Sequence, residues 1–200
     1  MARYTGPNYK RARRVGFSIE ETGKEIARRP YGPGQHGQDR KGKLSDYATQ
    51  LKEKQKVRFI YGVNERQFRK TFEEACKMRG SNGENFLKLL ESRLDNLVYR
   101  IGFATTRRGA RQLVNHGHVT VNGKKVDIPS YRCKPGEVIS LKEDDKKLKV
   151  VEDSLAKITK RVEFITYDEG KMEATYVRQP ERNELSADIN EALIVEFYNK

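Results

Sequence analysis

The sequence predicts an α+β fold with an extended basic arm at its N-terminus. Two changes of pattern along the chain support this prediction. Residues 1–43 are rich in Gly, Pro and Arg and show no helical period, whereas residues 44–117 carry apolar side chains at helical spacing. From Val119 onward, β-branched and turn residues follow the pattern of short strands, which predicts a small, mainly antiparallel β-sheet. A chain of 200 residues is long enough for two small domains.

Basic charge is concentrated in two segments. The chain carries 41 Lys and Arg against 28 Asp and Glu, for a net charge of +13. Residues 1–58 hold 15 basic and 6 acidic side chains, residues 100–125 hold six basic and no acidic ones, and the remainder is close to neutral. Solubility alone gives no reason to concentrate one sign, so this distribution favours a polyanionic partner over a solvated face. Nucleic acid and an anionic membrane are the two candidates.

The first predicted element is the arm of residues 1–43, which includes the run Arg-Arg-Pro-Tyr-Gly-Pro-Gly-Gln-His-Gly from Arg28 to Gly37. Pro and Gly disfavour regular structure there, and Arg supplies contacts for phosphate groups. Tyr4, Tyr9 and Tyr31 are candidates for stacking on unpaired bases. The alternative interpretation is a flexible tail with no part in binding.

Two helices are predicted after the arm. Ser45 is placed as the N-cap of a helix that ends at Gly62, and Asn64 as the cap of a second helix. The second helix carries an apolar stripe, in which Cys76 is expected to fill the core. The stripe consists of Phe68, Phe72, Ala75 and Cys76.

A third, long helix and a short basic one are predicted next. Apolar side chains recur along one broad face over residues 84–101, and Gly102 ends that helix. Thr106 is placed as the cap of the basic helix and Gly117 as its end.

The rest of the chain predicts strands. Asn122-Gly123 indicates a tight hairpin, because both positions of its turn need positive φ. Further strands are expected at residues 138–141, 163–167 and 172–177, the last two joined by a turn. Ser186 is placed as the cap of a short C-terminal helix that contains the apolar run of residues 193–198.

The basic helix and the hairpin after it favour contact with RNA. Arg107, Arg108 and Arg111 lie near the helix start, where guanidinium groups and backbone N–H groups both suit phosphate oxygens. Neutral hydrogen-bonding side chains follow and suit ribose hydroxyls and base edges. A DNA-reading helix-turn-helix is the alternative, but no second symmetric recognition unit or zipper is visible, and an arm with Arg and Tyr suits folded RNA better.

Several other classes are disfavoured by features that the sequence lacks. It has no run of roughly 18 to 20 apolar residues and no apolar signal segment, so we expect a cytoplasmic protein without a membrane span. Cys76 and Cys133 are far apart and have no His at zinc-ligand spacing, so neither a disulfide nor a metal is expected. No nucleotide-binding Gly loop or Cys-His pair is visible, so we expect no catalytic residue, no cofactor and no enzyme. The basic segments also lack the apolar face with which helices bind a membrane surface.

Three segments resemble a known RNA-binding module, which also occurs in pseudouridine synthases, tyrosyl-transfer-RNA synthetases and a heat-shock RNA binder. These segments are residues 92–100, residues 110–118 and Val121-Asn122-Gly123. Further matches lie at residues 1–7, 33–37, 44–47, 66–69, 189–191 and 194–198, so that they cover essentially the whole chain. With these matches the chain resembles one family in particular, the S-four family of small-subunit ribosomal proteins in its bacterial, zinc-free form.

The resemblance implies a structural component of the small ribosomal subunit. It implies primary binding to the five-way junction in the 5′ domain of small-subunit ribosomal RNA, nucleation of the assembly of the body, and, together with ribosomal protein S-five, a contribution to translational accuracy. Ribosomal protein S-three and messenger RNA are further candidate partners, because Arg40, Lys41 and Lys43 match family residues near the path by which the message enters. It also implies that a module of residues 91–185 is inserted into a helical domain of residues 44–90 and about 186–200.

We expect basic, aromatic and amide side chains from both basic segments to contact ribosomal RNA. These residues are Arg3, Tyr4, Lys10, Arg11, Arg13, Arg14, Arg29, Arg58, Arg66, Arg69, Arg93, Arg100, Arg107, Arg108, Arg111, Gln112, Asn115, His116, His118 and Lys124.

One departure from the family and two alternatives complete the expectations. Some relatives hold the arm with a four-cysteine zinc site, whose first two ligands would fall at Tyr9 and Ala12, so this chain cannot form that site. An RNA-modifying enzyme would need a separate catalytic domain, for which too few residues are left. A regulatory RNA binder that represses translation of a message stays open as a second role.

Overall fold

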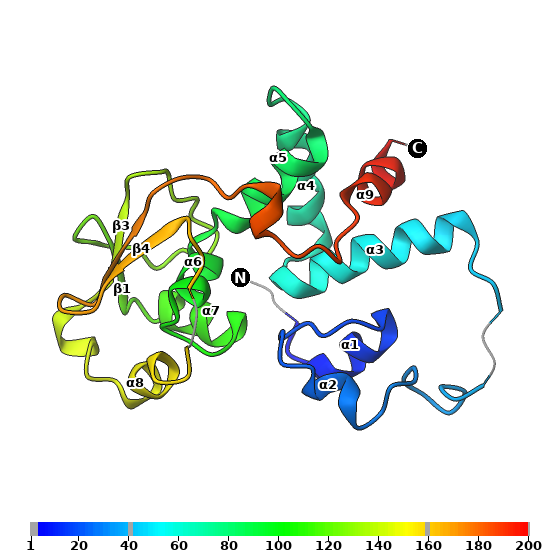
Figure 1. The fold of residues 1–200 in the computed structure, drawn as a ribbon, viewed down its shortest axis with the longest axis horizontal. Coiled ribbons are helices and arrows are strands. Elements are labelled where there is room, and N and C mark those ends of the chain that lie inside the picture. Colours follow the sequence, from blue (N-terminus) through cyan, green and yellow to red (C-terminus); the bar gives the residue numbers. More distant parts are fainter. Residues whose placement is uncertain (1–3, 40–41, 159–160, 200) are drawn as a thin grey trace. The chain divides into compact units, whose positions relative to one another are not determined.

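The computed structural model describes residues 4–39, 42–158 and 161–199 (Figure 1). Contacts divide the chain into two compact units, which we call the helical unit (residues 1–86 and 186–200) and the sheet unit (residues 87–185). Helices and an antiparallel sheet are both present, which confirms the predicted α+β class. Among the described residues, no helix combines the length and the apolar character needed to cross a bilayer.

The helical unit contains both helices predicted after the arm. α3 (Asp46–Tyr61) begins after Ser45, whose hydroxyl accepts a hydrogen bond of 3.3 Å from the N–H of Ala48, and ends at Gly62 with φ +61°. α4 (Glu65–Ala75) follows at once. Both predictions are confirmed. They were possible from the sequence because caps and a left-handed glycine are local signals.

Cys76 is exposed, so its predicted place in the core is wrong. α4 ends at Ala75, and Cys76 is only its cap residue. At 3.6 residues per turn, Cys76 also lies about 80° around the helix axis from Phe68, at the edge of the stripe. Phe68 and Phe72 are buried as expected and contact Phe86 edge-on.

The C-terminal helix is present, but its predicted cap is wrong. α9 (Glu191–Tyr198) begins after Asn190, whose side chain accepts from the N–H of Ala192 at 3.1 Å. Ser186 instead opens a turn, closed by a 3.3 Å bond from the N–H of Ile189. α9 lies along α3, and the ring of Tyr198 stacks on Phe72 with centroids 4.8 Å apart.

The N-terminal arm was predicted to be extended, but it is not extended throughout. It contains α1 (Asn8–Val15) and the short α2 (Lys24–Ala27). Three apolar residues of the arm, Ala12, Val15 and Ile19, form a small buried cluster with Phe59 of α3. This apolar stripe is too short to stand out among the Lys and Arg residues around it, although Gly16 ends α1 with φ +69° and was a usable signal.

The predicted long helix over residues 84–101 is two helices, α5 (Asn82–Glu91) and α6 (Leu94–Ile101). Between them, Arg93 has an extended backbone and forms an antiparallel bridge with Arg132. The carbonyl of Ser92 accepts from the N–H of Cys133 at 2.8 Å, and the N–H of Leu94 donates to the carbonyl of Tyr131 at 2.8 Å. A distant segment therefore takes over the hydrogen bonds that a continuous helix would need, which explains why local periodicity did not predict the break.

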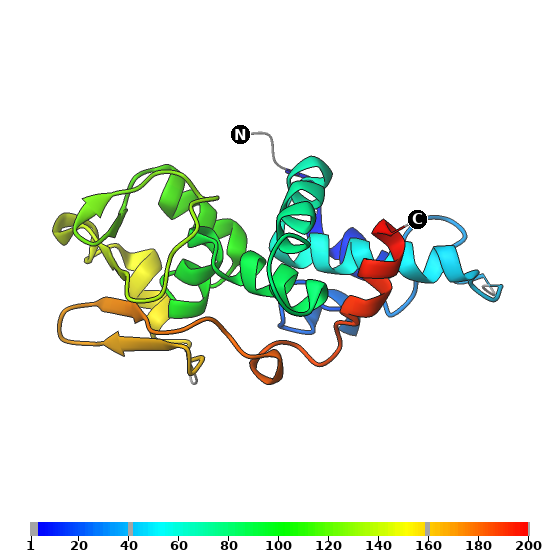
Figure 2. The same cartoon turned by 90° about the horizontal axis from the view of Figure 1, so that it is seen from above.

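In the described part of the sheet unit, the strands form a five-stranded antiparallel sheet of order β2-β1-β3-β5-β4. The predicted hairpin is confirmed, because Asn122 and Gly123 have φ +49° and +75°. The turn between β4 and β5 is also confirmed, and that hairpin is drawn in orange in Figure 2. The strands are β1 (Val119–Val121), β2 (Lys124–Lys125), β3 (Val138–Leu141), β4 (Ile165–Asp168) and β5 (Glu173–Tyr176).

α6, α7 (Arg107–Asn115) and the sheet share the main core, which includes the fully buried Leu97, Val114 and Val119. No helix or strand was predicted for residues 142–162, where the structure has α8 (Lys149–Leu155) after the 3-10 turn Glu143–Asp145. The hydroxyl of Ser154 donates to the carbonyl of Gly102 at 2.8 Å, so α8 satisfies an end group of α6. A second 3-10 turn, Arg182–Glu184, precedes the return of the chain to the helical unit.

Candidate nucleic-acid interface

α7 presents a polar and basic outer face. Its start is fixed by Thr106, whose hydroxyl accepts from the N–H of Gly109 at 3.1 Å, as the sequence predicted. Three apolar side chains, those of Ala110, Leu113 and Val114, are buried and hold the helix on the core. The outward side chains that the sequence predicted as RNA contacts are exposed. These are Arg108, Gln112, Asn115 and His116.

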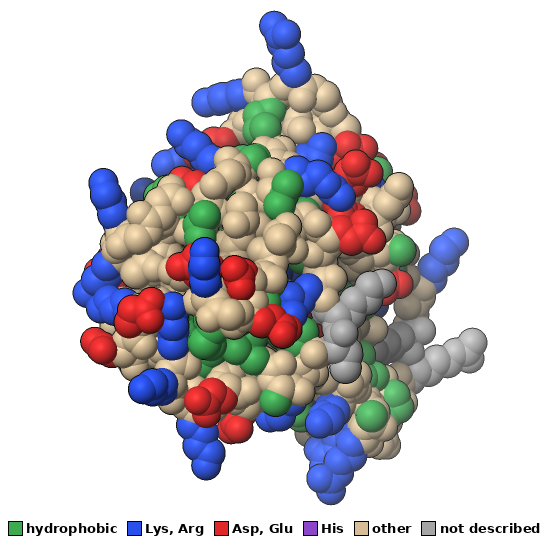
Figure 3. Space-filling view, turned by 60° about the vertical axis from the view of Figure 1, so that its left-hand side comes forward, with side chains coloured by type: hydrophobic (Ala, Val, Ile, Leu, Met, Phe, Trp, Pro, Cys, Tyr) green, Lys and Arg blue, Asp and Glu red, His purple; other side chains and the backbone are tan. Residues whose placement is uncertain are grey.

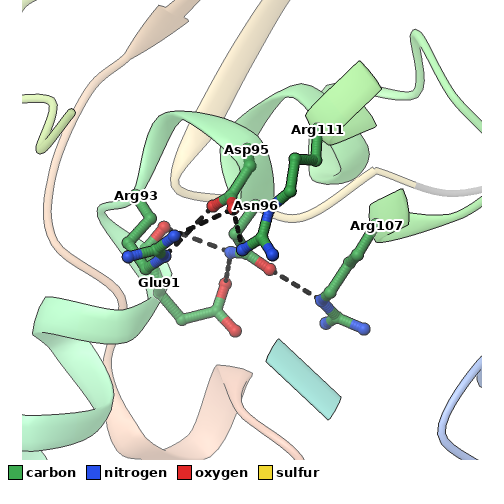
Figure 4. A network of polar contacts seen from close by, with 6 residues as sticks. All are labelled: Glu91, Arg93, Asp95, Asn96, Arg107 and Arg111. Carbon is green, nitrogen blue, oxygen red and sulfur yellow. Dashed lines mark hydrogen bonds and ion pairs between the residues drawn. The ribbon is translucent and has the colours of Figure 1, made fainter. Parts of the chain in front are cut away.

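Asp95 joins two of the predicted arginines inside the sheet unit (Figure 4). Its buried carboxylate accepts from Nε and Nη2 of Arg93 at 3.1 and 2.9 Å. The same carboxylate accepts from Nε and Nη2 of Arg111 at 3.0 and 2.6 Å. Because Asp95 belongs to α6 and Arg111 to α7, this pair fixes the orientation of the basic helix at its middle.

A second buried carboxylate, that of Glu91, organises the adjoining side chains. Asn96 donates from Nδ2 to Oε2 of Glu91 at 2.6 Å, and Arg100 donates from Nη2 to Oε1 at 3.0 Å. Asn96 in turn accepts from Nε of Arg107 at 2.9 Å, and the Arg107 guanidinium lies 4.4 Å from the ring centroid of Tyr99. The two networks thus hold four predicted arginines in defined positions before any ligand is bound.

His118 and the hairpin continue the surface beyond α7. Nδ1 of His118 lies 2.8 Å from the carboxylate of Asp145, and its ring centroid is 6.0 Å from that of His116. The hairpin turn leads into β2, where Lys124 is exposed.

In the helical unit, two predicted arginines stack on predicted tyrosines. The guanidinium carbon of Arg11 lies 3.2 Å from the ring centroid of Tyr4. Arg13 donates to the carbonyl of Tyr31 at 3.0 Å and lies 5.1 Å from its ring centroid. One face of each ring is therefore occupied by a cation, whereas Tyr9 is 50% exposed.

Other predicted residues of the helical unit differ in how much surface they offer. Arg58 is half-buried and pairs with Glu65 at 2.9 Å, and the exposed Arg69 pairs with Glu73 at 3.2 Å. Three predicted residues, Arg3, Arg40 and Lys41, lie outside the described residues. The remaining predicted cations are exposed, namely Lys10, Arg14, Arg29, Lys43 and Arg66.

Comparison with known proteins decides the family. The family model described as "Ribosomal protein S4/S9 N-terminal domain" matches residues 3–91, and the "S4 domain" model matches residues 92–139. "Small ribosomal subunit protein uS4" of Ligilactobacillus salivarius is 61% identical over 201 residues and 100% of both chains. The uS4 proteins of a Geobacillus species and of Halalkalibacterium halodurans are 61% and 60% identical over 200 residues, again over 100% of both chains. The chain belongs to the uS4 family.

The uS4 family is one of ribosomal proteins and not of enzymes, in agreement with the sequence analysis. The two family models meet between Glu91 and Ser92, where α5 ends and the chain enters its bridge with residues 131–133. The border between the two matched segments is therefore also a local change of backbone structure.

Arg93 has a structural role in the protein. Its side chain is buried and bonded to Asp95, so we do not retain it among the proposed RNA contacts. Sequence reasoning missed the positioning side chains of Glu91, Asp95 and Asn96, which the resemblance covered only in part and without a role. Acidic and amide residues inside an otherwise apolar helix were the available signal, because such groups are buried only when partnered.

The face of the molecule that Figure 3 shows carries both positive and negative side chains. Lys, Arg, Asp and Glu side chains are interspersed on that face, so it forms no continuous cationic surface. Among the described residues, no group of three or more His, Cys, Asp and Glu is arranged to hold a metal ion. Tyr9 and Ala12, where the resemblance would place the first two zinc ligands, both lie on α1.

Proposed function

We propose that the chain is a cytoplasmic structural component of the small ribosomal subunit that binds the five-way junction in the 5′ domain of small-subunit ribosomal RNA. The observation that carries this proposal is the identity of about 60% with uS4 proteins over the full length of both chains. The concentration of basic charge in residues 1–58 and 100–125 supports it, because phosphate contacts dominate affinity for nucleic acid.

The finer roles follow from the family resemblance. We propose that binding nucleates assembly of the body and that, together with ribosomal protein S-five, the chain contributes to translational accuracy. We also propose that Arg40, Lys41 and Lys43 contact messenger RNA at the path by which it enters, near ribosomal protein S-three.

The proposed contacts fall into two classes with different physical roles. Exposed side chains act directly on phosphate, ribose and bases, whereas half-buried arginines act on RNA from positions fixed by the protein. The first class in the described residues is Lys10, Arg14, Arg29, Arg66, Arg69, Arg108, Gln112, Asn115, His116 and Lys124. The second class is Arg11, Arg13, Arg58, Arg100, Arg107 and Arg111, with Tyr4 and His118 beside them. Arg3 belongs to the proposed set but lies outside the described residues.

Hydroxyl-radical footprinting of small-subunit ribosomal RNA with and without the purified chain tests this proposal. We expect protection at the five-way junction of the 5′ domain and none in a separate transcript of the 3′ domain. For about 6–10 phosphate contacts, affinity should fall by roughly 10³ to 10⁵ across a fourfold rise in salt. Equal protection of both transcripts would contradict the proposed site, and no binding at low salt would contradict the function.

A further inference from the structure

Lys125 lies across a glycine at the end of the basic helix. A Cβ atom added at Gly117 would lie 2.3 Å from Cε and 2.8 Å from Nζ of Lys125, far inside van der Waals contact. Gly117 follows α7 and has φ +75°, and Lys125 is on β2, opposite Thr120 of β1. The stem of Lys125 therefore lies where a side chain at residue 117 would lie, and it can do so because residue 117 is a glycine.

The ammonium group of Lys125 is held beside α7 and belongs to an exposed side chain. It lies beside the C-terminal end of α7, whose partial negative charge attracts a cation and holds it there. Asn115 and His116 of the same helix end are exposed, and so is Lys125 itself. Among the described residues, no carboxylate pairs with Lys125, in contrast to the arginines bound by Asp95 and Glu91.

We propose that Lys125 binds a phosphate group of the RNA and that Gly117 positions it. This inference rests on the proposed function and extends its site by one residue that sequence reasoning did not select. Adjacent residues of a strand point to opposite faces, so Lys124 and Lys125 present their ammonium groups on different sides of β2. Only Lys125 is brought to the end of α7 by its contact with Gly117, next to the exposed amide and imidazole groups.

Gly117 ends α7 at positive φ, but the atoms that an alanine would meet there can move. The colliding atoms belong to the far end of a flexible side chain, so an alanine at residue 117 displaces the Lys125 stem without moving backbone. Gly117→Ala should therefore give a folded protein with some strain at its positive φ, and with the ammonium group moved from its site.

Filter binding of the full chain to a 5′-domain transcript over a salt series tests the proposal. The variants are Lys125→Met, which keeps the length of the stem, Lys125→Arg, which keeps the charge, and Gly117→Ala. Lys171→Met is the matched control, because it removes one exposed lysine from the turn between β4 and β5. Thermal unfolding by circular dichroism of each variant reports whether the fold is retained.

We expect Lys125→Met to make the slope of log affinity against log salt smaller in magnitude by roughly 0.7–0.9, as for the loss of one phosphate contact. Lys171→Met should leave the slope unchanged, and Lys125→Arg should restore most of it. Gly117→Ala should weaken binding in the wild-type chain but add nothing in the Lys125→Met chain, since both changes act on one group.

Three results would overturn the inference, each in a distinguishable way. A wild-type chain that binds the transcript, with Lys125→Met binding as tightly and with the same salt slope, refutes the role of Lys125 alone. A wild-type chain that does not bind the transcript at low salt refutes the proposed function and this inference together. Additive effects of Gly117→Ala and Lys125→Met would refute the positioning role of the glycine.

Discussion

The sheet unit and the N-terminal arm both contain cationic side chains, but they place these side chains in opposite environments. In the sheet unit, Arg93 and Arg111 both bind the buried carboxylate of Asp95, so part of their charge is neutralised inside the protein. In the arm, Lys10 and Arg14 are exposed on one face of α1, four residues apart. A count of basic residues therefore overstates the charge that the sheet unit offers to RNA, whereas Lys10 and Arg14 of the arm offer theirs in full.

The comparison predicts that substitutions in the two regions separate stability from affinity. Removing one partner of a buried, hydrogen-bonded pair leaves an uncompensated charge, whereas removing an exposed cation leaves nothing unsatisfied. Unfolding experiments should respond to the first kind of change and salt-dependent binding to the second.

The largest effect is expected for Asp95→Ala. It leaves the buried guanidinium of Arg93 without its carboxylate, which should lower the free energy of unfolding by about 3–5 kcal/mol. Urea unfolding followed by circular dichroism measures this change. Asp153→Ala is the matched control, because Asp153 is an exposed acid on α8, and it should change stability by no more than about 0.5 kcal/mol. Equal stability of the two variants would show that the network does not hold the sheet unit together.

The next effect should be on binding alone. Replacing both Lys10 and Arg14 by Ala removes two exposed cations, so affinity for a 5′-domain transcript should fall on the order of tenfold and the salt slope should shrink by roughly 1–2. The free energy of unfolding should stay within about 0.5 kcal/mol of the wild-type value. Lys149→Ala with Lys157→Ala removes the same charge on and just after α8 and serves as the control in the filter-binding titration. If both double variants bind equally, the arm contributes only general charge and the contrast with the sheet unit is lost.

The same contrast explains what the sequence could and could not predict. α3, α7 and the hairpin at Asn122-Gly123 were predictable because caps, left-handed glycines and turn residues act within a few positions. The break between α5 and α6 was not, because its hydrogen bonds come from residues 131–133, about forty positions away in the chain.

The accuracy of the predicted site was limited by tertiary contacts in the same way. The sequence indicates which side chains are cationic, but their partners are determined by tertiary structure. Arg111 and Asp95 are 16 residues apart and meet only because α6 and α7 pack together. In the arm, α1 was missed because its buried stripe is short and lies among basic residues. Two of its cations, Lys10 and Arg14, are exposed.

The smallest effect concerns a buried acid that shapes the arm itself. Glu25 accepts hydrogen bonds from the N–H of Glu20 at 2.7 Å and from the hydroxyls of Ser18 and Thr22 at 2.8 and 3.1 Å. Burial by itself would raise the pKa of this carboxyl, but these hydrogen bonds outweigh it and hold the pKa below its ordinary value. The ionised form therefore belongs to the folded arm.

A carboxyl whose pKa is lowered by folding stabilises the fold above its unfolded pKa, and that contribution disappears as the pH falls through the folded pKa. On acidification, backbone amides of residues 18–27 should therefore lose protection from hydrogen exchange before those of the sheet unit, as measured by mass spectrometry over a pH series. Exchange rates must first be corrected for their intrinsic pH dependence. In Glu25→Gln the local opening should no longer depend on pH in this range, because no proton is taken up at residue 25. If the wild-type arm opens only together with the sheet unit, the hydrogen bonds to Glu25 do not control its local opening. The small apolar cluster around Ala12 and Phe59 would then be the feature that holds the arm in place.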